Sequence, residues 1–130
     1  MLTKKDLHNC LRILIVDDNI CDQDLMLRLL NRIGLSADVA GSGIEVINAL
    51  QSQHYDVILM DVQMPAMDGL ETTRYIRHRW HDRIIRIIGV TGCIQKGDRE
   101  MCIQAGMDDY IAKPAVKGAL ENALSRFHLY

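Results

Sequence analysis

The chain has 130 residues, of which 48% are hydrophobic and 25% charged, a composition typical of a single globular domain with one core. Its 15 basic and 17 acidic residues give a net charge of −2, which argues against a nucleic-acid surface built on phosphate contacts. The longest apolar runs are far shorter than a membrane span, and no charged-then-apolar leader opens the chain. We therefore expect a cytoplasmic domain without a membrane segment.

The cysteines and histidines show no spacing typical of metal sites. The four cysteines lie far apart without a C-x-x-C pair, which argues against a zinc or disulfide framework. Each is expected to be a small core residue: Cys10, Cys21, Cys93 and Cys102. The five histidines stand among polar neighbours and are expected at the surface: His8, His54, His78, His81 and His128.

The first half of the chain alternates between strand-like and helix-like patterns. Residues 11–16 form a short β-branched run that ends in acids and predicts a buried strand. Apolar residues from Leu25 to Ile33 then recur at helical spacing, and Gly34 is a plausible helix stop. Residues 36–40 predict a short strand, and the apolar residues from Ile44 to Leu50 predict a second helix.

The second half repeats the alternation. Residues 56–60 predict a third strand, followed by a loop with Pro65 and Gly69 and a third helix through Leu70 and Ile76. Residues 84–90 predict the fourth strand, 96–106 the fourth helix, 109–112 the fifth strand and 115–127 the last helix. The alternation continues to the end of the chain.

Five strands alternating with five helices predict an α/β fold with a parallel sheet covered on both faces. The first, third and fourth strands are almost wholly apolar and therefore central, whereas the second and fifth suit the edges. This pattern predicts a flavodoxin-like, doubly wound sheet with strand order 2-1-3-4-5. No linker interrupts it, so we expect one domain over residues 11–128, preceded by a linker or extension at residues 1–10.

Polar residues gather at the predicted carboxyl ends of the strands, where such sheets bind ligands. Asp17 and Asp18 follow the first strand, and Asp61 follows the third. Thr91 follows the fourth strand, and Lys113 follows the fifth. We expect these five side chains to meet in one pocket.

Three clustered carboxylates repel one another unless a cation lies among them. Ligands that are all oxygen favour a hard ion, so the cluster predicts a Mg²⁺ site, with Mn²⁺ as a second option. An aspartate can also act as a nucleophile toward phosphorus, and we assign that role to Asp61.

The stretches LIVDDN, ILMDVQMPAMDG, VTG and AKP together resemble the response-regulator receiver domain of two-component signalling. The resemblance runs from about Leu11 to Phe127. It implies that Asp61 accepts phosphate from a phosphohistidine, and that Asp17 and Asp18 hold Mg²⁺ directly or through water. The backbone carbonyl of Gln63 would complete the metal site.

The same resemblance implies a switch. Thr91 and Lys113 would contact the phosphoryl group, and Tyr110 would swing inward as the Thr91 hydroxyl moves toward it. Pro114 implies a cis peptide bond with Lys113, a geometry that only proline makes inexpensive.

Two positions depart from the family pattern. Gly92 and then Cys93 follow Thr91, where the family commonly has alanine directly after the hydroxyl residue. Neither Gln63 nor Cys93 supplies an obvious general base, so we expect slow loss of the phosphate.

Several functions remain open. We expect a self-phosphorylating switch with weak autophosphatase activity, which acts with a histidine kinase or a histidine phosphotransfer protein. The resemblance favours a domain of a hybrid sensor histidine kinase, and a stand-alone regulator and a phosphorylation-independent pseudo-receiver scaffold are the alternatives. A phosphohydrolase of the haloacid-dehalogenase type would need an acid where Gln63 stands. A homodimer through the face of the fourth helix and fifth strand is possible, and exposure of Met107 and Ile111 would favour docking there.

Simpler explanations exist for some residues. The pair Asp17 and Asp18 could cap a helix, and Asp68 before Gly69 is best explained as a turn and cap residue. The basic stretch at residues 74–83 is typical of a solvated amphipathic helix. Met64 and Met67 could line a partner surface or fill gaps.

Overall fold

A computed structural model describes residues 11–92 and 98–127. The predicted linker at residues 1–10 lies outside these ranges, and so do Cys10, Cys93, His8 and His128. Everything that follows concerns the described residues.

Five parallel strands form one sheet in the order β2-β1-β3-β4-β5, which confirms the predicted flavodoxin-like fold. The strands are β1 (Ile13–Val16), β2 (Asp38–Ala40), β3 (Val57–Asp61), β4 (Arg86–Thr91) and β5 (Asp109–Ala112). The helices between and after them are α2 (Ile20–Arg32), α3 (Gly43–Ser52), α4 (Gly69–Arg79), α5 (Asp98–Ala105) and α6 (Lys117–Arg126).

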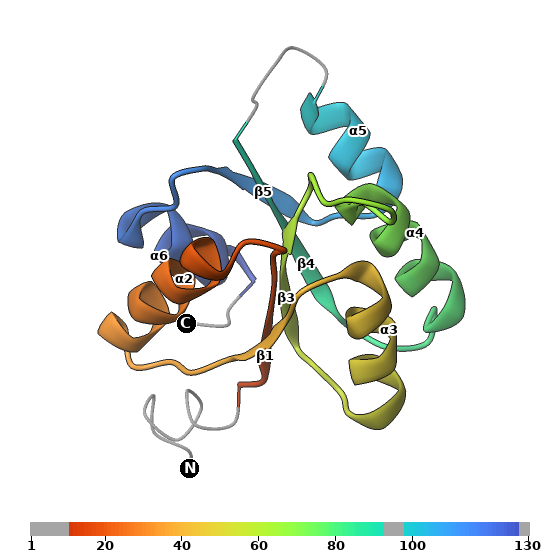
Figure 1. Cartoon of the computed structure of the whole chain (residues 1–130), viewed down its shortest axis with the longest axis horizontal. Helices are drawn as coiled ribbons and strands as arrows, with labels where there is room; N and C mark the ends of the chain where they lie inside the picture. The colour runs from red at the N-terminus through yellow and green to blue at the C-terminus, as the bar shows by residue number, and fades with distance from the viewer. Residues whose placement is uncertain (1–10, 93–97, 128–130) are drawn as a thin grey trace.

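The helices cover the sheet on two sides. Helices α2 and α6 lie on one face, and α3, α4 and α5 lie on the other (Figure 1). Each face has its own apolar cluster: Val46, Leu70 and Cys102 belong to one, and Leu30 and Leu124 to the other. Strands β1 and β3 are buried along their whole length because helices cover both their faces.

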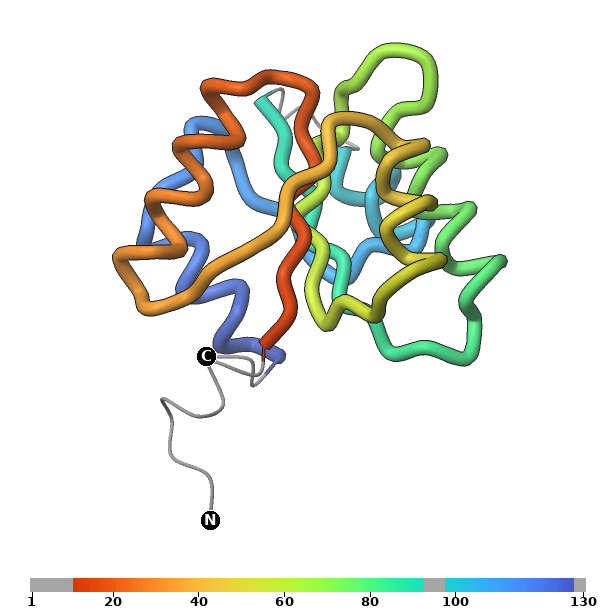
Figure 2. The backbone as a smooth tube through the Cα atoms, turned by 60° about the horizontal axis from the view of Figure 1, so that its bottom comes forward, coloured from red at the N-terminus to blue at the C-terminus, as the bar shows by residue number. Residues whose placement is uncertain are grey.

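The parallel strands bring their carboxyl ends to one edge of the sheet. Figure 2 shows β1 and β3 running to this edge, where the loop between β3 and α4 rises above the helices. The loops that follow β1, β2, β3 and β5 therefore lie at this edge, which is where the predicted site residues stand.

Three helices begin with side-chain caps. Asn19 accepts a hydrogen bond from the backbone N–H of Asp22 at α2, and Ser42 does the same for Glu45 at α3. Asp68 caps α4 by accepting from the N–H of Glu71, as the sequence predicted. Because Asn19 caps α2, the alternative that the preceding acidic pair serves as the cap is wrong.

The positions of some residues differ from the sequence prediction. Ile84 was placed in the fourth strand, but it is 77% exposed, since pairing begins only where Arg86 meets Val57. Cys102 is buried as predicted. Cys21 is exposed, contrary to the prediction, because it lies on the solvent-facing side of the first turn of α2. Met64 is buried, which favours the gap-filling role for that residue.

The basic stretch after residue 74 is only partly solvated. Its Arg77 side chain is half-buried and donates hydrogen bonds to the carbonyls of Gly106 and Ile85. His54, His78 and His81 are exposed as expected. None of the helices in the described ranges is long and apolar enough to span a membrane.

Candidate functional site

The strand register places the acidic residues side by side. Val16 of β1 pairs with Met60 of β3, so Asp17 and Asp61 come next on neighbouring strands. On the other side of β1, the N–H of Asp17 donates to the carbonyl of Ala40 in β2 at 3.1 Å. The backbone that carries the carboxylates is thus held by the sheet.

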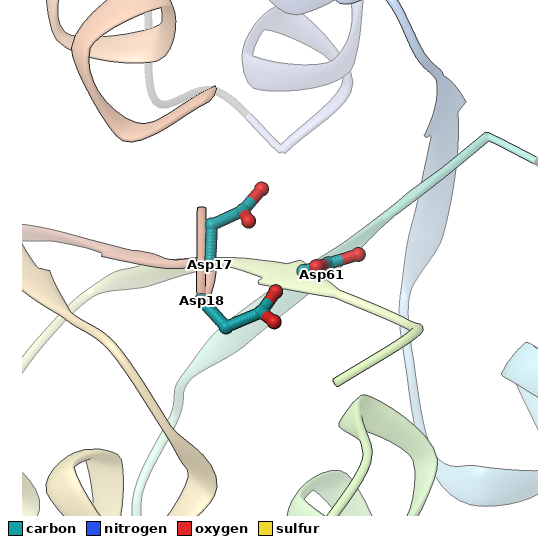
Figure 3. Close-up of side chains that lie close together, drawn as sticks. All are labelled: Asp17, Asp18 and Asp61. Atoms are coloured by element: carbon teal, nitrogen blue, oxygen red, sulfur yellow. The ribbon is translucent and has the colours of Figure 1, made fainter. Parts of the chain in front are cut away.

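The three carboxylates that the sequence singled out do converge. Asp17, Asp18 and Asp61 each offer one oxygen, and these oxygens all lie within 4.8 Å of one another. Figure 3 shows Asp17 and Asp18 at the end of β1, with Asp61 beside them on β3. Asp17 and Asp61 are buried, and Asp18 is exposed. The cluster therefore opens to solvent at Asp18, while its other two carboxylates lie below the surface.

Lys113 reaches the cluster from the end of β5. Its Nζ lies 2.9 Å from Oδ2 of Asp17 and 3.3 Å from Oδ1 of Asp61. The lysine backbone is fixed because its N–H donates to the carbonyl of Thr91 at 2.8 Å. Burial alone would lower the pKa of Lys113, but its hydrogen bond to Asp17 and the charges of Asp61 and Asp17 raise it overall. The ammonium therefore stays charged at neutral pH.

The surroundings of Asp61 change its proton affinity. Burial and the neighbouring charge of Asp17 raise the pKa of Asp61 to about 6, although Lys113 and the backbone N–H of Gln63 act in the opposite direction. Above that pH the carboxylate is ionised and can act as a nucleophile.

Local backbone contacts orient the two buried carboxylates. Oδ1 of Asp17 accepts a hydrogen bond from the N–H of Asn19 at 2.9 Å, and Oδ1 of Asp61 accepts from the N–H of Gln63 at 3.2 Å. A Cβ at Gly69 would lie 2.2 Å from the backbone oxygen of Asp61, so only glycine lets the start of α4 approach this closely.

The remaining predicted residues occupy the same edge. Thr91 is the last residue of β4 and is buried. Tyr110 is half-buried in β5 and pairs with Gly89 of β4. Two residues further along both strands, Thr91 pairs with Ala112. The peptide bond between Lys113 and Pro114 is cis, as predicted. The inward movement of Tyr110 stays a prediction.

The cluster suits a hard divalent ion. All the side-chain donors are carboxylate oxygens, the ligands that Mg²⁺ prefers. Two ligands of one Mg²⁺ lie at most about 4.2 Å apart, because each bond is about 2.1 Å long. The oxygens here lie within 4.8 Å of one another, a separation that direct binding, or binding through one bridging water, can accommodate. The fit is good for direct or water-mediated binding.

One contact was missed by the sequence reasoning. Nζ of Lys113 also lies 3.3 Å from Oδ2 of Asp22, an acid on the first turn of α2. The sequence carries no local signal for this contact: the spacing from the cap Asn19 places Asp22 on the first turn of α2, but its partner lies 91 residues away.

Comparison with known proteins decides the family. The model of the response regulator receiver domain matches residues 13–125, almost the whole chain. The chain belongs to this family. Phosphoryl transfer to an aspartate is the general function of receiver domains, and they bind Mg²⁺ in their active sites.

Similar receiver domains occur in much longer proteins. The chain is 40% identical over 124 residues to hybrid signal transduction histidine kinase K of Dictyostelium discoideum, covering 89% of this chain and 10% of that protein. It is also similar to the receiver domain of sensor histidine kinase PA1611 from Pseudomonas aeruginosa, whose crystal structure has magnesium coordinated in the active-site cleft. That match has 39% identity and a TM-score of 0.80, and it covers 89% of this chain and 95% of the other.

A third similar structure contains a partner. It is a co-crystal of the Saccharomyces cerevisiae histidine phosphotransfer protein Ypd1 with the receiver domain of the response regulator Ssk1. The match has 25% identity and a TM-score of 0.81, and it covers 88% of this chain and 86% of the other.

Proposed function

We propose that this receiver domain takes a phosphoryl group from a phosphohistidine onto Asp61 and relays a signal by changing conformation. The convergence of three carboxylates within 4.8 Å, with the Lys113 ammonium 3.3 Å from Asp61, carries the proposal. A buried, ionisable carboxylate beside a fixed cation is the arrangement that phosphoryl transfer needs.

The transfer is an in-line displacement. A carboxylate oxygen of Asp61 attacks the phosphorus, and the new O–P bond forms as the P–N bond to the donor imidazole breaks. The imidazole nitrogen keeps the electron pair of the broken bond. Lys113 balances the charge on the phosphoryl oxygens, and the Thr91 hydroxyl donates a hydrogen bond to one of them.

The metal site in this proposal consists of Asp17, Asp18, Asp61 and the backbone carbonyl of Gln63. When bound there, Mg²⁺ would neutralise negative charge on the carboxylates and on the phosphoryl oxygens. Mn²⁺ has the same preference for oxygen and is an alternative ion at this site.

The partner we propose is a histidine kinase or a histidine phosphotransfer protein. Similarity to the receiver domain that crystallised with Ypd1 supports it. Similarity to hybrid signal transduction histidine kinase K supports a further inference, that this receiver domain acts as part of a hybrid kinase; a stand-alone regulator is the alternative. A cytoplasmic location stays part of the proposal.

Labelling with acetyl phosphate tests the acceptor. In this reaction acetate leaves with the electron pair of the broken P–O bond. We expect Mg²⁺-dependent labelling of the wild type and none of Asp61→Asn, while the surface variant Asp24→Asn labels normally. Labelling that persists in Asp61→Asn would remove Asp61 from the proposal. An unlabelled wild type would favour the pseudo-receiver alternative.

The proposed phosphate is long-lived. Gln63 is exposed beside Asp61 and has an amide instead of a base, so it cannot activate an attacking water efficiently. The same residue argues against a phosphohydrolase of the haloacid-dehalogenase type. Decay of the labelled protein within seconds at neutral pH with Mg²⁺ would contradict slow hydrolysis.

A homodimer through α5 and β5 is a further part of the proposal. Met107 and Ile111, whose exposure would have favoured it, are both buried, but Met101 and Ile103 of α5 are 50% and 47% exposed. Sedimentation of the phosphorylated domain tests it. Met101→Glu should keep the domain monomeric, whereas Ile44→Glu, at a residue of α3 that is 63% exposed, should not.

A further inference from the structure

Lys113 is shared among carboxylates. Within the described ranges its Nζ contacts Asp17 at 2.9 Å, Asp61 at 3.3 Å and Asp22 at 3.3 Å. An ammonium has three N–H donors, so three acceptors occupy it fully. A phosphoryl oxygen that arrives at Asp61 can gain a hydrogen bond from Lys113 only if one of these contacts gives way.

Asp22 differs from the other two partners of Lys113. Asp17 and Asp61 are buried and belong to the predicted metal site, whereas the Asp22 side chain is 43% exposed and lies outside that site. An exposed ion pair is weak because water screens it. The contact with Asp22 is therefore the one that Lys113 releases most readily.

The backbone of Asp22 keeps its carboxylate close to the site. Its N–H donates to the side chain of the cap residue Asn19 at 3.1 Å, which fixes the first turn of α2. A negative charge on this turn is also favoured by the helix dipole. Asp22 therefore adds a fixed negative charge beside Lys113.

We propose that Asp22 is a positioning residue that competes with the incoming phosphoryl group for the ammonium of Lys113 and so slows phosphorylation of Asp61. The inference rests on the proposed function, because it concerns the same transfer reaction. Removal of the Asp22 charge frees one N–H of Lys113 and lowers the repulsion of an anionic phosphodonor. Both effects increase the rate.

The matched control is Asp24, two residues along the same helix. Asp24 pairs with Arg28 at the surface, 2.9 Å away, and both side chains are largely exposed. Asp24→Asn removes the same charge from the same helix without touching Lys113. A general effect of net charge on donor binding would change both variants alike.

The test measures the initial rate of phosphorylation by acetyl phosphate, over a range of donor concentrations and with Mg²⁺ saturating for each variant. We expect Asp22→Asn to react about two- to fivefold faster than the wild type, the range that corresponds to one exposed ion pair. Asp22→Ala should react as fast as Asp22→Asn, and the conservative variant Asp22→Glu should return to the wild-type rate. The increase in rate of Asp22→Asn over the wild type should be smaller at high salt, because salt screens the charge of Asp22.

The outcomes separate this inference from the proposed function. If the wild type is labelled on Asp61 but Asp22→Asn reacts no faster than Asp24→Asn, only the role of Asp22 is overturned. A slower Asp22→Asn with unchanged thermal unfolding would also overturn it, because it would mean that Asp22 assists the reaction. If the wild type is not labelled at all, both proposals fail.

Discussion

The carboxyl group of Asp61 connects stability with function at the scale of one residue. Burial, with the charge of Asp17, raises the pKa of Asp61 to about 6, above the ordinary value of 3.8. The folded protein therefore carries an unfavourable charge at neutral pH, whereas the unfolded chain carries it without penalty. The penalty is absent below the unfolded pKa and complete above the folded pKa.

We predict that Asp61→Asn stabilises the metal-free domain at pH 7.5. The gain in unfolding free energy should be at most about 3 kcal/mol, since one pKa unit corresponds to about 1.4 kcal/mol. The difference in unfolding free energy between the two proteins should decrease as the pH falls through 6 and reach zero near pH 4. Urea unfolding of both proteins across this range measures it. Asp24→Asn should show no such trend, and a gain that does not change with pH would contradict the explanation.

At the scale of elements, Asp68 fixes the start of α4. It caps the helix by accepting from the N–H of Glu71 at 2.9 Å, and the helix begins against the backbone of Asp61. The capping side chain is not among the residues that converge on Lys113. Its contribution should therefore be to helix stability alone.

We predict that Asp68→Ala lowers the unfolding free energy by about 1 kcal/mol, the usual contribution of an N-cap. Asp68→Asn should retain most of it, because the amide oxygen can still accept the hydrogen bond. Chemical denaturation measures the loss, and acetyl phosphate labelling should be nearly unchanged in both variants. A large fall in labelling at equal stability would give Asp68 a chemical role.

Arg77 joins three elements at the opposite edge of the sheet. From α4 it donates to the carbonyls of Gly106 and Ile85 at 2.8 and 2.7 Å, and to Oδ2 of Asp108 at 2.9 Å. The same oxygen of Asp108 accepts from the N–H of Ile87 at the start of β4. The turn before β5 and the start of β4 are thus tied to one helix.

We predict that Arg77→Ala destabilises the domain by about 2 to 3 kcal/mol, because half-buried acceptors lose their donors. The control is Arg79→Ala, two residues along α4, where the exposed guanidinium lies 5.3 Å from the centre of the Trp80 ring. It should change stability by less than about 1 kcal/mol. Thermal unfolding compares the two, and equal losses would mean that the hydrogen bonds of Arg77 contribute little.

These examples show what the sequence could and could not predict. Asp17, Asp61 and Thr91 were located correctly because each ends an apolar strand, and parallel strands end at one edge. The partner of Arg77 lies 31 residues away, and that of Asp22 lies 91 residues away. No local sequence pattern encodes such pairs, since they depend on how the helices pack against the sheet. Ile84 was misplaced because a β-branched residue before a strand resembles the strand itself.

At the scale of the whole molecule, the carboxylate cluster makes stability depend on magnesium. Three acids within 4.8 Å repel one another in the folded state, and an ion bound among them relieves that repulsion. An ion that binds only the folded protein also stabilises it by mass action. The predicted metal site should therefore be visible in unfolding as well as in phosphorylation.

We predict that Mg²⁺ at about a hundredfold excess over its dissociation constant raises the unfolding free energy by about 2.7 kcal/mol. Asp18→Asn should be more stable than the wild type without the ion, because one charge of the cluster is gone. Both Asp17→Asn and Asp18→Asn should gain little stability when Mg²⁺ is added. Asp24→Asn should gain as much as the wild type. Urea unfolding with and without MgCl₂ measures all four proteins. If the wild type gains nothing, or if Asp18→Asn gains as much as the wild type, the ion does not bind among these carboxylates.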